Sequence, residues 1–109
     1  MKLAMLGTGA IAPVALAAME AVPSIRVEAL WCRQHSRQRG EALAREYGIP
    51  RVYTDCRALF QKADVDTAYI ALVNPVHFAY AREALLAGKN VILENPSALS
   101  SPRPRNWRN

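Results

Sequence analysis

The sequence feature that most constrains the fold of this chain is an apolar run that leads into a glycine-rich turn. Leu3 to Leu6 are followed directly by Gly7-Thr8-Gly9-Ala10-Ile11-Ala12, the pattern G-x-G-x-x-A where a strand would turn into a helix. Gly7 would permit the tight turn, Gly9 would let the backbone approach a pyrophosphate, and Ala12 would let the helix lie close to the strand. Unpaired N–H groups in the first helical turn would face the phosphates. The pattern predicts a dinucleotide-binding loop; the alternative is an ordinary strand-to-helix turn.

The size and composition favour one globular domain. The chain has 109 residues, of which 51% are hydrophobic, enough for a core. No apolar run reaches the roughly 18 residues of a membrane span, and no secretory signal pattern begins the chain. Cys32 and Cys56 have no metal-ligand spacing. We expect reduced thiols, no bound metal, no membrane partner and a cytoplasmic location.

The positive charge is concentrated at the carboxyl terminus. The formal net charge is +5, from 14 basic and 9 acidic residues, and Arg103, Arg105 and Arg108 lie in residues 100–109, which contain no acid. The remaining residues are therefore nearly neutral. We expect a disordered basic tail at 100–109 and no nucleic-acid partner, although nucleic-acid binding through the tail is an alternative that its deletion would test.

Expected strands and helices alternate along the chain. The strands are expected at residues 2–6, 25–31, 52–53, 67–73 and 91–93, and the helices at residues 11–21, 36–47, 55–62 and 76–87. This alternation predicts an α/β fold with a doubly wound parallel sheet in the order 3-2-1-4-5. That order brings together the ends of strands one, four and five, which carry Gly7–Gly9, residues 73–77 and residues 94–96.

Short-range signals mark the helix ends. Ser36 and Asp55 are expected N-caps, and Gly48 is expected to end the second helix. Glu41 and Arg45 have the i,i+4 spacing of an ion pair.

Two helices carry apolar faces. The first has one charged residue, Glu20, and is otherwise apolar nearly all round. The fourth has Phe78, Ala81 and Leu85 at the spacing of one buried face. Because nothing in the chain obviously covers the first helix, we expect homo-oligomers or aggregation through apolar surface.

Two further segments carry a resemblance to a known family. Residues 66–77 (DTAYIALVNPVH) and 85–96 (LLAGKNVILENP), with the turn Tyr47-Gly48-Ile49-Pro50 and the glycine-rich loop, resemble the amino-terminal domain of the Gfo/Idh/MocA oxidoreductases. These are the relatives of glucose–fructose oxidoreductase and inositol dehydrogenase. The resemblance covers residues 2–99 and implies an NAD(P)-binding Rossmann domain at residues 1–99. It also implies hydride transfer at a sugar, polyol or related substrate, with a second domain binding the substrate.

The resemblance also implies a set of cofactor-binding residues. They are Gly7, Thr8, Gly9, Ala10 and Ile11 in the pyrophosphate loop, Ala71, Leu72, Val73, Asn74 and His77 beside the ribose and nicotinamide, and Glu94 and Asn95 in the family's Glu-Lys-Pro motif. Simpler roles remain for three residues: His77 as a helix-start residue, Glu94 as a structural acid, and Trp31 as a core residue.

Three departures from the family pattern affect the expected activity. Asn95 replaces the family's Lys and cannot supply a cation or exchange a proton near neutral pH. Val73 replaces a usual Pro, and the pattern stops after Leu99. We therefore assign no catalytic residue and expect a cofactor-binding half that is inactive alone. The alternative is a non-catalytic NAD(P)-binding regulatory or interaction module.

The end of the second strand bears on the choice of cofactor. An acid there would bind the ribose 2′-hydroxyl of NAD, but the nearest, Glu28, lies inside the strand. Arg33 and Arg37 follow the strand and could pair with a 2′-phosphate. The sequence favours NADP, with NAD as the alternative.

Overall fold

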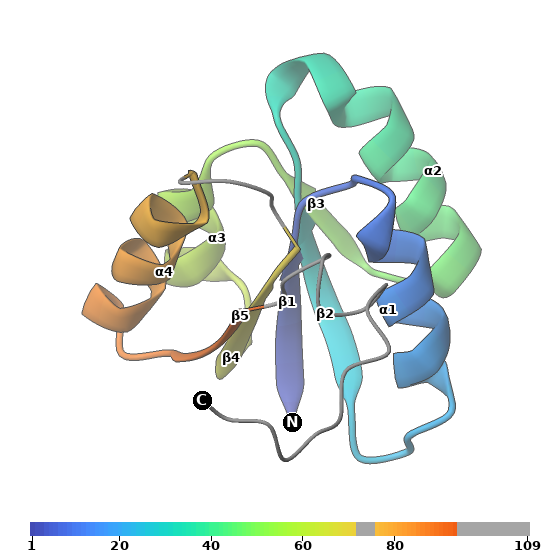
Figure 1. The fold of residues 1–109 in the computed structure, drawn as a ribbon, viewed down its shortest axis with the longest axis horizontal. Helices are drawn as coiled ribbons and strands as arrows, with labels where there is room; N and C mark the ends of the chain where they lie inside the picture. The colour runs from blue at the N-terminus through green and yellow to red at the C-terminus, as the bar shows by residue number, and fades with distance from the viewer. Residues whose placement is uncertain (72–75, 94–109) are drawn as a thin grey trace, which may run out of the picture.

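A parallel sheet flanked by helices forms the fold. The computed structural model describes residues 1–71 and 76–93, with only the backbone for residues 76–78. The elements are β1 (Lys2–Leu6), α1 (Ile11–Glu20), β2 (Arg26–Trp31), a 3₁₀ turn η1 (Gln34–Ser36), α2 (Arg37–Tyr47), β3 (Arg51–Tyr53), α3 (Cys56–Lys62), β4 (Thr67–Ile70), α4 (Val76–Leu86) and β5 (Asn90–Leu93). All strand pairs are parallel, in the order β3-β2-β1-β4-β5 (Figure 1), which confirms the predicted topology.

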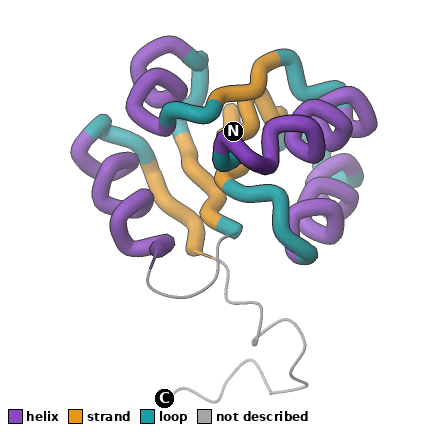
Figure 2. The backbone as a smooth tube through the Cα atoms, turned by 90° about the horizontal axis from the view of Figure 1, so that it is seen from above, coloured by secondary structure: helices purple, strands orange, loops and turns teal. Residues whose placement is uncertain are grey.

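The central strand divides the core into two halves. Leu3 to Leu6 are fully buried in β1, and successive side chains point to opposite faces of the sheet. Leu3 and Met5 pack with α1 and α2, whereas Ala4 and Leu6 pack with α3 and α4. Viewed from above, the two helix pairs lie on opposite sides of the sheet (Figure 2). No helix among the described residues is long and apolar enough to cross a membrane.

The helix ends agree only partly with the sequence signals. The Asp55 carboxylate accepts from the N–H of Arg57 (3.0 Å) and so caps α3, and Gly48 ends α2 with φ +67°. Both predictions are confirmed. Ser36 occupies the N-cap position of α2, but its side chain makes no capping hydrogen bond. The prediction of a Ser36 cap is wrong because η1 leads directly into the helix.

The buried face of α4 also differs from the prediction. Ala81 and Ala84 are buried, whereas Leu85 is 61% exposed. The small side chains face the sheet and let the helix approach it closely, so Leu85 faces outward with its neighbour Leu86. The predicted carboxyl end of strand four, residues 72–73, lies outside the described residues.

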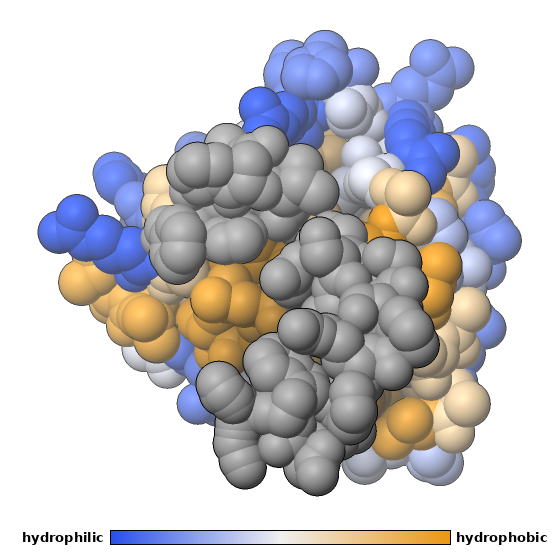
Figure 3. Space-filling model, in the orientation of Figure 1, coloured by the Kyte–Doolittle hydropathy of each residue, from blue (hydrophilic) through white to orange (hydrophobic). Residues whose placement is uncertain are grey.

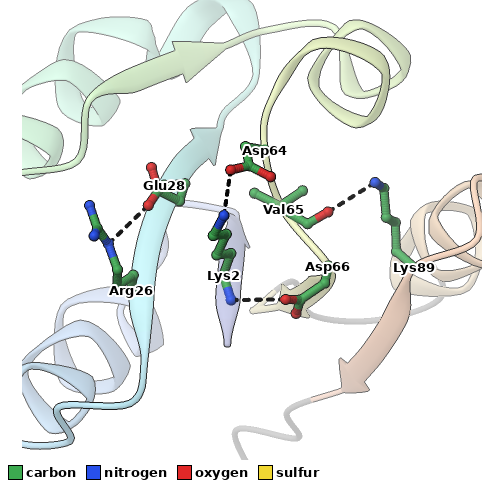
Figure 4. Close-up of polar contacts among 7 residues, drawn as sticks. All are labelled: Lys2, Arg26, Glu28, Asp64, Val65, Asp66 and Lys89. Carbon is green, nitrogen blue, oxygen red and sulfur yellow. Dashed lines mark hydrogen bonds and ion pairs between the residues drawn. The ribbon is translucent and has the colours of Figure 1, made fainter.

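Polar contacts hold the amino edge of the sheet (Figure 4). Lys2 Nζ lies 2.6 Å from a carboxylate oxygen of Asp64, and the Lys2 N–H donates to Asp66 at 3.2 Å. The Thr67 hydroxyl (2.7 Å) and the Lys2 N–H both stabilise the ionised Asp66 and lower the pKa of its carboxyl group. Further contacts at this edge are the Arg26–Glu28 ion pair (3.0 Å) and the bond from Lys89 Nζ to the Val65 carbonyl (2.9 Å).

Gly40 allows α2 to lie directly against the end of β2. A Cβ atom at Gly40 would lie 2.7 Å from Cys32 Sγ and 3.1 Å from Leu30 Cδ2. Both neighbours are buried core side chains, with little room to move. Gly40 therefore sets how closely the first turns of α2 approach the sheet.

We predict that Gly40→Ala destabilises the fold. The gain in helix propensity is about 1 kcal/mol, whereas overpacking costs about 1–3 kcal/mol, so the net loss should be on the order of 1 kcal/mol. Denaturant unfolding measures the change. In a Cys32→Ala background the substitution should be less harmful, because the closest clashing atom is gone; an equal loss in both backgrounds would contradict this explanation.

Candidate functional site

The glycine-rich loop is held at the carboxyl edge of the sheet. Gly7 directly follows β1, has φ +118°, and donates its N–H to the Trp31 carbonyl at 2.9 Å. The bond continues the ladder between β1 and β2 by one residue beyond Leu6. A positive φ of this size is accessible to glycine and strained for other residues. The sequence prediction that Gly7 makes the tight turn is therefore confirmed.

Open space and free backbone donors lie beyond this turn. A Cβ atom at Gly9 would meet nothing within 4 Å. Ala10 is the N-cap residue of α1 and has no side chain that could cap it. No described residue accepts a hydrogen bond from the N–H of Gly9 or Ala10. The loop thus combines space, N–H donors without a described acceptor and the positive end of a helix dipole, the features that a phosphate group requires.

The end of β2 contributes basic side chains. Arg33 is exposed and has no hydrogen-bond or ion-pair partner among the described residues. Arg37 Nε lies 2.9 Å from a Glu41 carboxylate oxygen. The predicted Glu41–Arg45 pair is therefore wrong, because Glu41 has an arginine four residues away on both sides and pairs with the earlier one. Glu28 pairs with Arg26 near the opposite edge of the sheet (Figure 4).

A cleft of about 400 Å³ lies at the carboxyl end of β2, on the α3 and α4 side of the sheet. Trp31 and Tyr80 line it with their ring centroids 4.5 Å apart, and Trp31 Nε1 is buried with no hydrogen-bond partner in the part of the chain that the structure describes. The prediction that Trp31 is buried is confirmed, at 3% exposure. Sequence reasoning missed the cleft itself; the available signal was an indole at the last position of a strand. Its other lining residues are Thr54, Asp55, Cys56, Arg57 and Glu83.

The structure places only part of the predicted site. The buried Ala71 donates its N–H to the Leu6 carbonyl at 3.0 Å, which puts it beside the glycine-rich loop. His77 belongs to the first turn of α4, but its side chain is not among those described. The other predicted residues, Leu72, Val73, Asn74, Glu94 and Asn95, lie outside the described residues, as does the tail at 100–109.

The described residues offer no metal cluster and no reactive thiolate. No group of three or more His, Cys, Asp or Glu side chains in residues 1–71 and 79–93 could hold a metal ion. Burial raises the pKa of the Cys56 thiol to about 12, and it also raises the pKa of Cys32. Both thiols are therefore protonated at neutral pH and are poor nucleophiles.

The order of strands, the glycine-rich loop at the switch point and the free helix terminus together define a dinucleotide-binding Rossmann domain. A sequence profile described as "Oxidoreductase family, NAD-binding Rossmann fold" (GFO_IDH_MocA) matches residues 1–105. The chain belongs to this Gfo/Idh/MocA family, as the resemblance predicted.

Individual relatives agree with this assignment. D-xylose 1-dehydrogenase (NADP(+)) 2 of Haloferax volcanii is 32% identical over 101 residues, which are 93% of this chain and 30% of the relative. Trans-1,2-dihydrobenzene-1,2-diol dehydrogenase of Oryctolagus cuniculus is 31% identical over 89% of this chain and 30% of its own length. An oxidoreductase from Agrobacterium radiobacter, solved with NAD⁺, L-tartaric acid and magnesium, superposes with a TM-score of 0.79 at 26% identity, covering 88% of this chain and 28% of that one. The chain thus spans under a third of the length of these relatives.

We predict that Gly9→Val abolishes dinucleotide binding without unfolding the protein. A Cβ atom at this position meets nothing within 4 Å, so the valine side chain extends into the open space beside the Gly9 and Ala10 N–H groups. Calorimetric titration should show the loss, while the unfolding midpoint stays close to that of the parent.

The matched control is Gly48→Ala at the end of α2. Its φ of +67° makes alanine unfavourable there, by about 1 kcal/mol, so this variant should lose stability and retain binding. Retained binding in Gly9→Val would contradict the placement of the phosphates.

Proposed function

We propose that this chain binds NADP(H) in preference to NAD(H), as the cofactor-binding half of a Gfo/Idh/MocA-type oxidoreductase. The observation that carries the proposal is Arg33 at the end of β2, near the Gly7 turn. It has no hydrogen-bond or ion-pair partner among the described residues, and no unpaired carboxylate is described there. Arg37 is a second candidate contact, weakened by its pairing with Glu41.

The described residues fit a dinucleotide. The space at Gly9 and the free N–H groups of Gly9 and Ala10 suit a pyrophosphate, and Thr8 and Ile11 flank them. Ala71 lies at the neighbouring strand end, with Leu72, Val73, Asn74 and His77 following it in the chain. When bound, the nicotinamide would carry the hydride, and we propose Glu94 and Asn95 as further contacts on the nicotinamide side.

The preference for NADP follows from charge. A carboxylate at the end of β2 would accept from the 2′-hydroxyl of NAD and repel the 2′-phosphate of NADP, whereas an arginine pairs with that phosphate. The relatives do not agree on the cofactor, since the Haloferax enzyme is named for NADP(+) and the Agrobacterium protein was solved with NAD⁺. The proposed preference of this chain for NADP therefore rests on the local charge at Arg33.

We predict that Arg33→Ala weakens NADPH binding by about tenfold, the effect of one lost charge-assisted hydrogen bond, and leaves NADH binding unchanged. Arg45→Ala, at the far end of α2, is the matched control and should bind both cofactors like the parent. Calorimetric titration of both cofactors decides the matter. A parent that prefers NADH, or an Arg33→Ala protein with parental NADPH affinity, would refute the assignment.

Hydride transfer by the 109 residues alone is not expected. The match ends within the first third of the relatives, and the proposed substrate, a sugar, polyol or related compound, must be held against the nicotinamide beside a proton-transferring group. Asn95 provides no such group. We therefore expect no change in nicotinamide absorbance with a panel of sugars and polyols, and turnover that survives repurification would show this to be wrong.

The alternative, a non-catalytic NAD(P)-binding regulatory or interaction module, shares the cofactor site. Introducing Asn95→Lys into a version of this chain joined to a relative's substrate domain distinguishes the two proposals. Gain of turnover supports a cofactor-binding half, and binding without turnover supports the module.

We also propose self-association through the outer face of α1. Val14 is 61% exposed, and Ala17 and Ala18 beside it are exposed as well. Apolar colour is visible on the side of Figure 3 where Figure 1 places α1. A second apolar patch, Leu85 and Leu86, lies at the end of α4, on the opposite face of the sheet.

We predict that Val14→Lys lowers the sedimentation coefficient of the associated protein toward that of a monomer, because a lysine there opposes apolar contact. Leu86→Lys is the control on the other face and should leave association unchanged. A parent that stays monomeric at high concentration, or dispersal by Leu86→Lys alone, would contradict the involvement of α1.

A further inference from the structure

Arg39 reaches from α2 to the glycine-rich loop. Its Nε donates to the carbonyl oxygen of Thr8, 31 residues earlier in the chain. Three arginines lie between β2 and the second turn of α2, and among the described residues Arg39 is the one that contacts this loop. Arg37 pairs with Glu41, and Arg33 has no described partner. Neither the motif nor the family resemblance singled it out.

The position of Arg39 follows from the neighbouring glycine. Gly40 lies against Cys32 and Leu30, so closely that a Cβ atom would clash with Cys32 and contact Leu30 tightly. This close approach brings the first turns of α2 to the carboxyl edge of the sheet, where the loop leaves β1. The packing of α2 at Gly40 therefore fixes the position of the Arg39 backbone, from which the side chain reaches Thr8.

Holding the Thr8 carbonyl also orients the next N–H. The Thr8 carbonyl and the Gly9 N–H belong to one peptide unit, and in a trans peptide they point in opposite directions. If the oxygen is directed to α2, the Gly9 N–H is directed away from α2. That N–H has no described acceptor, and the space at Gly9 is open.

The guanidinium also changes the electrostatics of the loop. A carbonyl oxygen next to a pyrophosphate would repel it, and a charge-assisted hydrogen bond offsets that partial negative charge. Nε is one of five N–H donors on the group, so a delocalised positive charge remains at the loop.

We propose that Arg39 is a positioning residue for dinucleotide binding, which sets the peptide between Thr8 and Gly9 so that its N–H faces the pyrophosphate. This inference rests on the proposed function. It differs from the role of Arg33 because it concerns the pyrophosphate, which NADH and NADPH share, and so predicts no selectivity between them.

The test compares Arg39→Ala, Arg39→Lys and the matched control Gln38→Ala, an exposed neighbour in the same turn, in the full 109-residue chain. Arg39→Ala should weaken NADH and NADPH binding by the same factor, about three- to tenfold for one hydrogen bond. Adenosine, which has no phosphate, should compete as it does in the parent. Arg39→Lys should recover part of the loss through its charge, and Gln38→Ala should match the parent.

Two further readouts separate positioning from a structural role. The amide resonance of Gly9 in the ligand-free protein should shift in Arg39→Ala, and millimolar guanidinium should restore dinucleotide affinity in that variant alone. The unfolding midpoint should not change, because the contact is exposed.

The outcomes are distinguishable. A parent that binds neither cofactor refutes the proposed function. A parent that binds both, with Arg39→Ala unchanged, refutes only the role of Arg39. A loss confined to NADPH would make Arg39 a reader of the 2′-phosphate, and an equal loss for adenosine with a lower unfolding midpoint would make it structural; either overturns the proposal.

Discussion

Burial of β1 on both faces is the constraint on which the rest of the structure depends. Leu3 to Leu6 are fully buried, and their side chains alternate between two separate halves of the core. A strand buried in this way must have neighbours on both edges and helices on both faces. Crossovers between parallel strands are right-handed. The chain can therefore place helices on both faces only if strands are added first on one side of β1 and then on the other. The reversal places the switch point beside β1, where the glycine-rich loop begins.

The register of the strands then decides which residues meet at the site. Leu6 pairs with Trp31 on one side and with Ile70 on the other. The residues that follow these three, Gly7, Cys32 and Ala71, therefore leave the sheet at one level. A one-residue slip would turn the side chains of β1 to the wrong half of the core, so the packing of β1 also protects the geometry of the site.

The fold could be predicted from the sequence because its signals are strong and local. The apolar run before Gly7 and the continuous apolar stretch from Thr67 identify the central strands, and Gly48 and Asp55 identify helix ends. The partners of charged side chains were harder to predict, since more than one partner can have the same sequence spacing. Glu41 has arginines at positions −4 and +4, so the spacing alone does not say that it pairs with Arg37. The Thr8–Arg39 contact joins segments 31 residues apart, so no local pattern indicates it.

The two edges of the sheet also differ in how their charges are balanced. At the amino edge, Asp64 pairs with the Lys2 ammonium group, and Asp66 accepts from the Lys2 backbone N–H (Figure 4) and from the Thr67 hydroxyl. At the carboxyl edge, Glu41 is occupied by Arg37 and Asp55 by the cap of α3, which leaves Arg33 and Arg39 as cations without a described carboxylate partner. The amino ends of α1 and α4 add partial positive charge at the same edge.

Exposed charges act over roughly one Debye length, about 8 Å at physiological salt. The charges at the amino edge are therefore too far from the loop to affect an anion bound there, and the carboxylates at that edge have local partners. Among the described residues, the cations at the carboxyl edge without a carboxylate partner are Arg33 and Arg39, and Arg39 contacts the glycine-rich loop directly. The affinity for an anion bound at this edge would therefore change far more on the loss of one nearby arginine than on a change in the total charge of the protein.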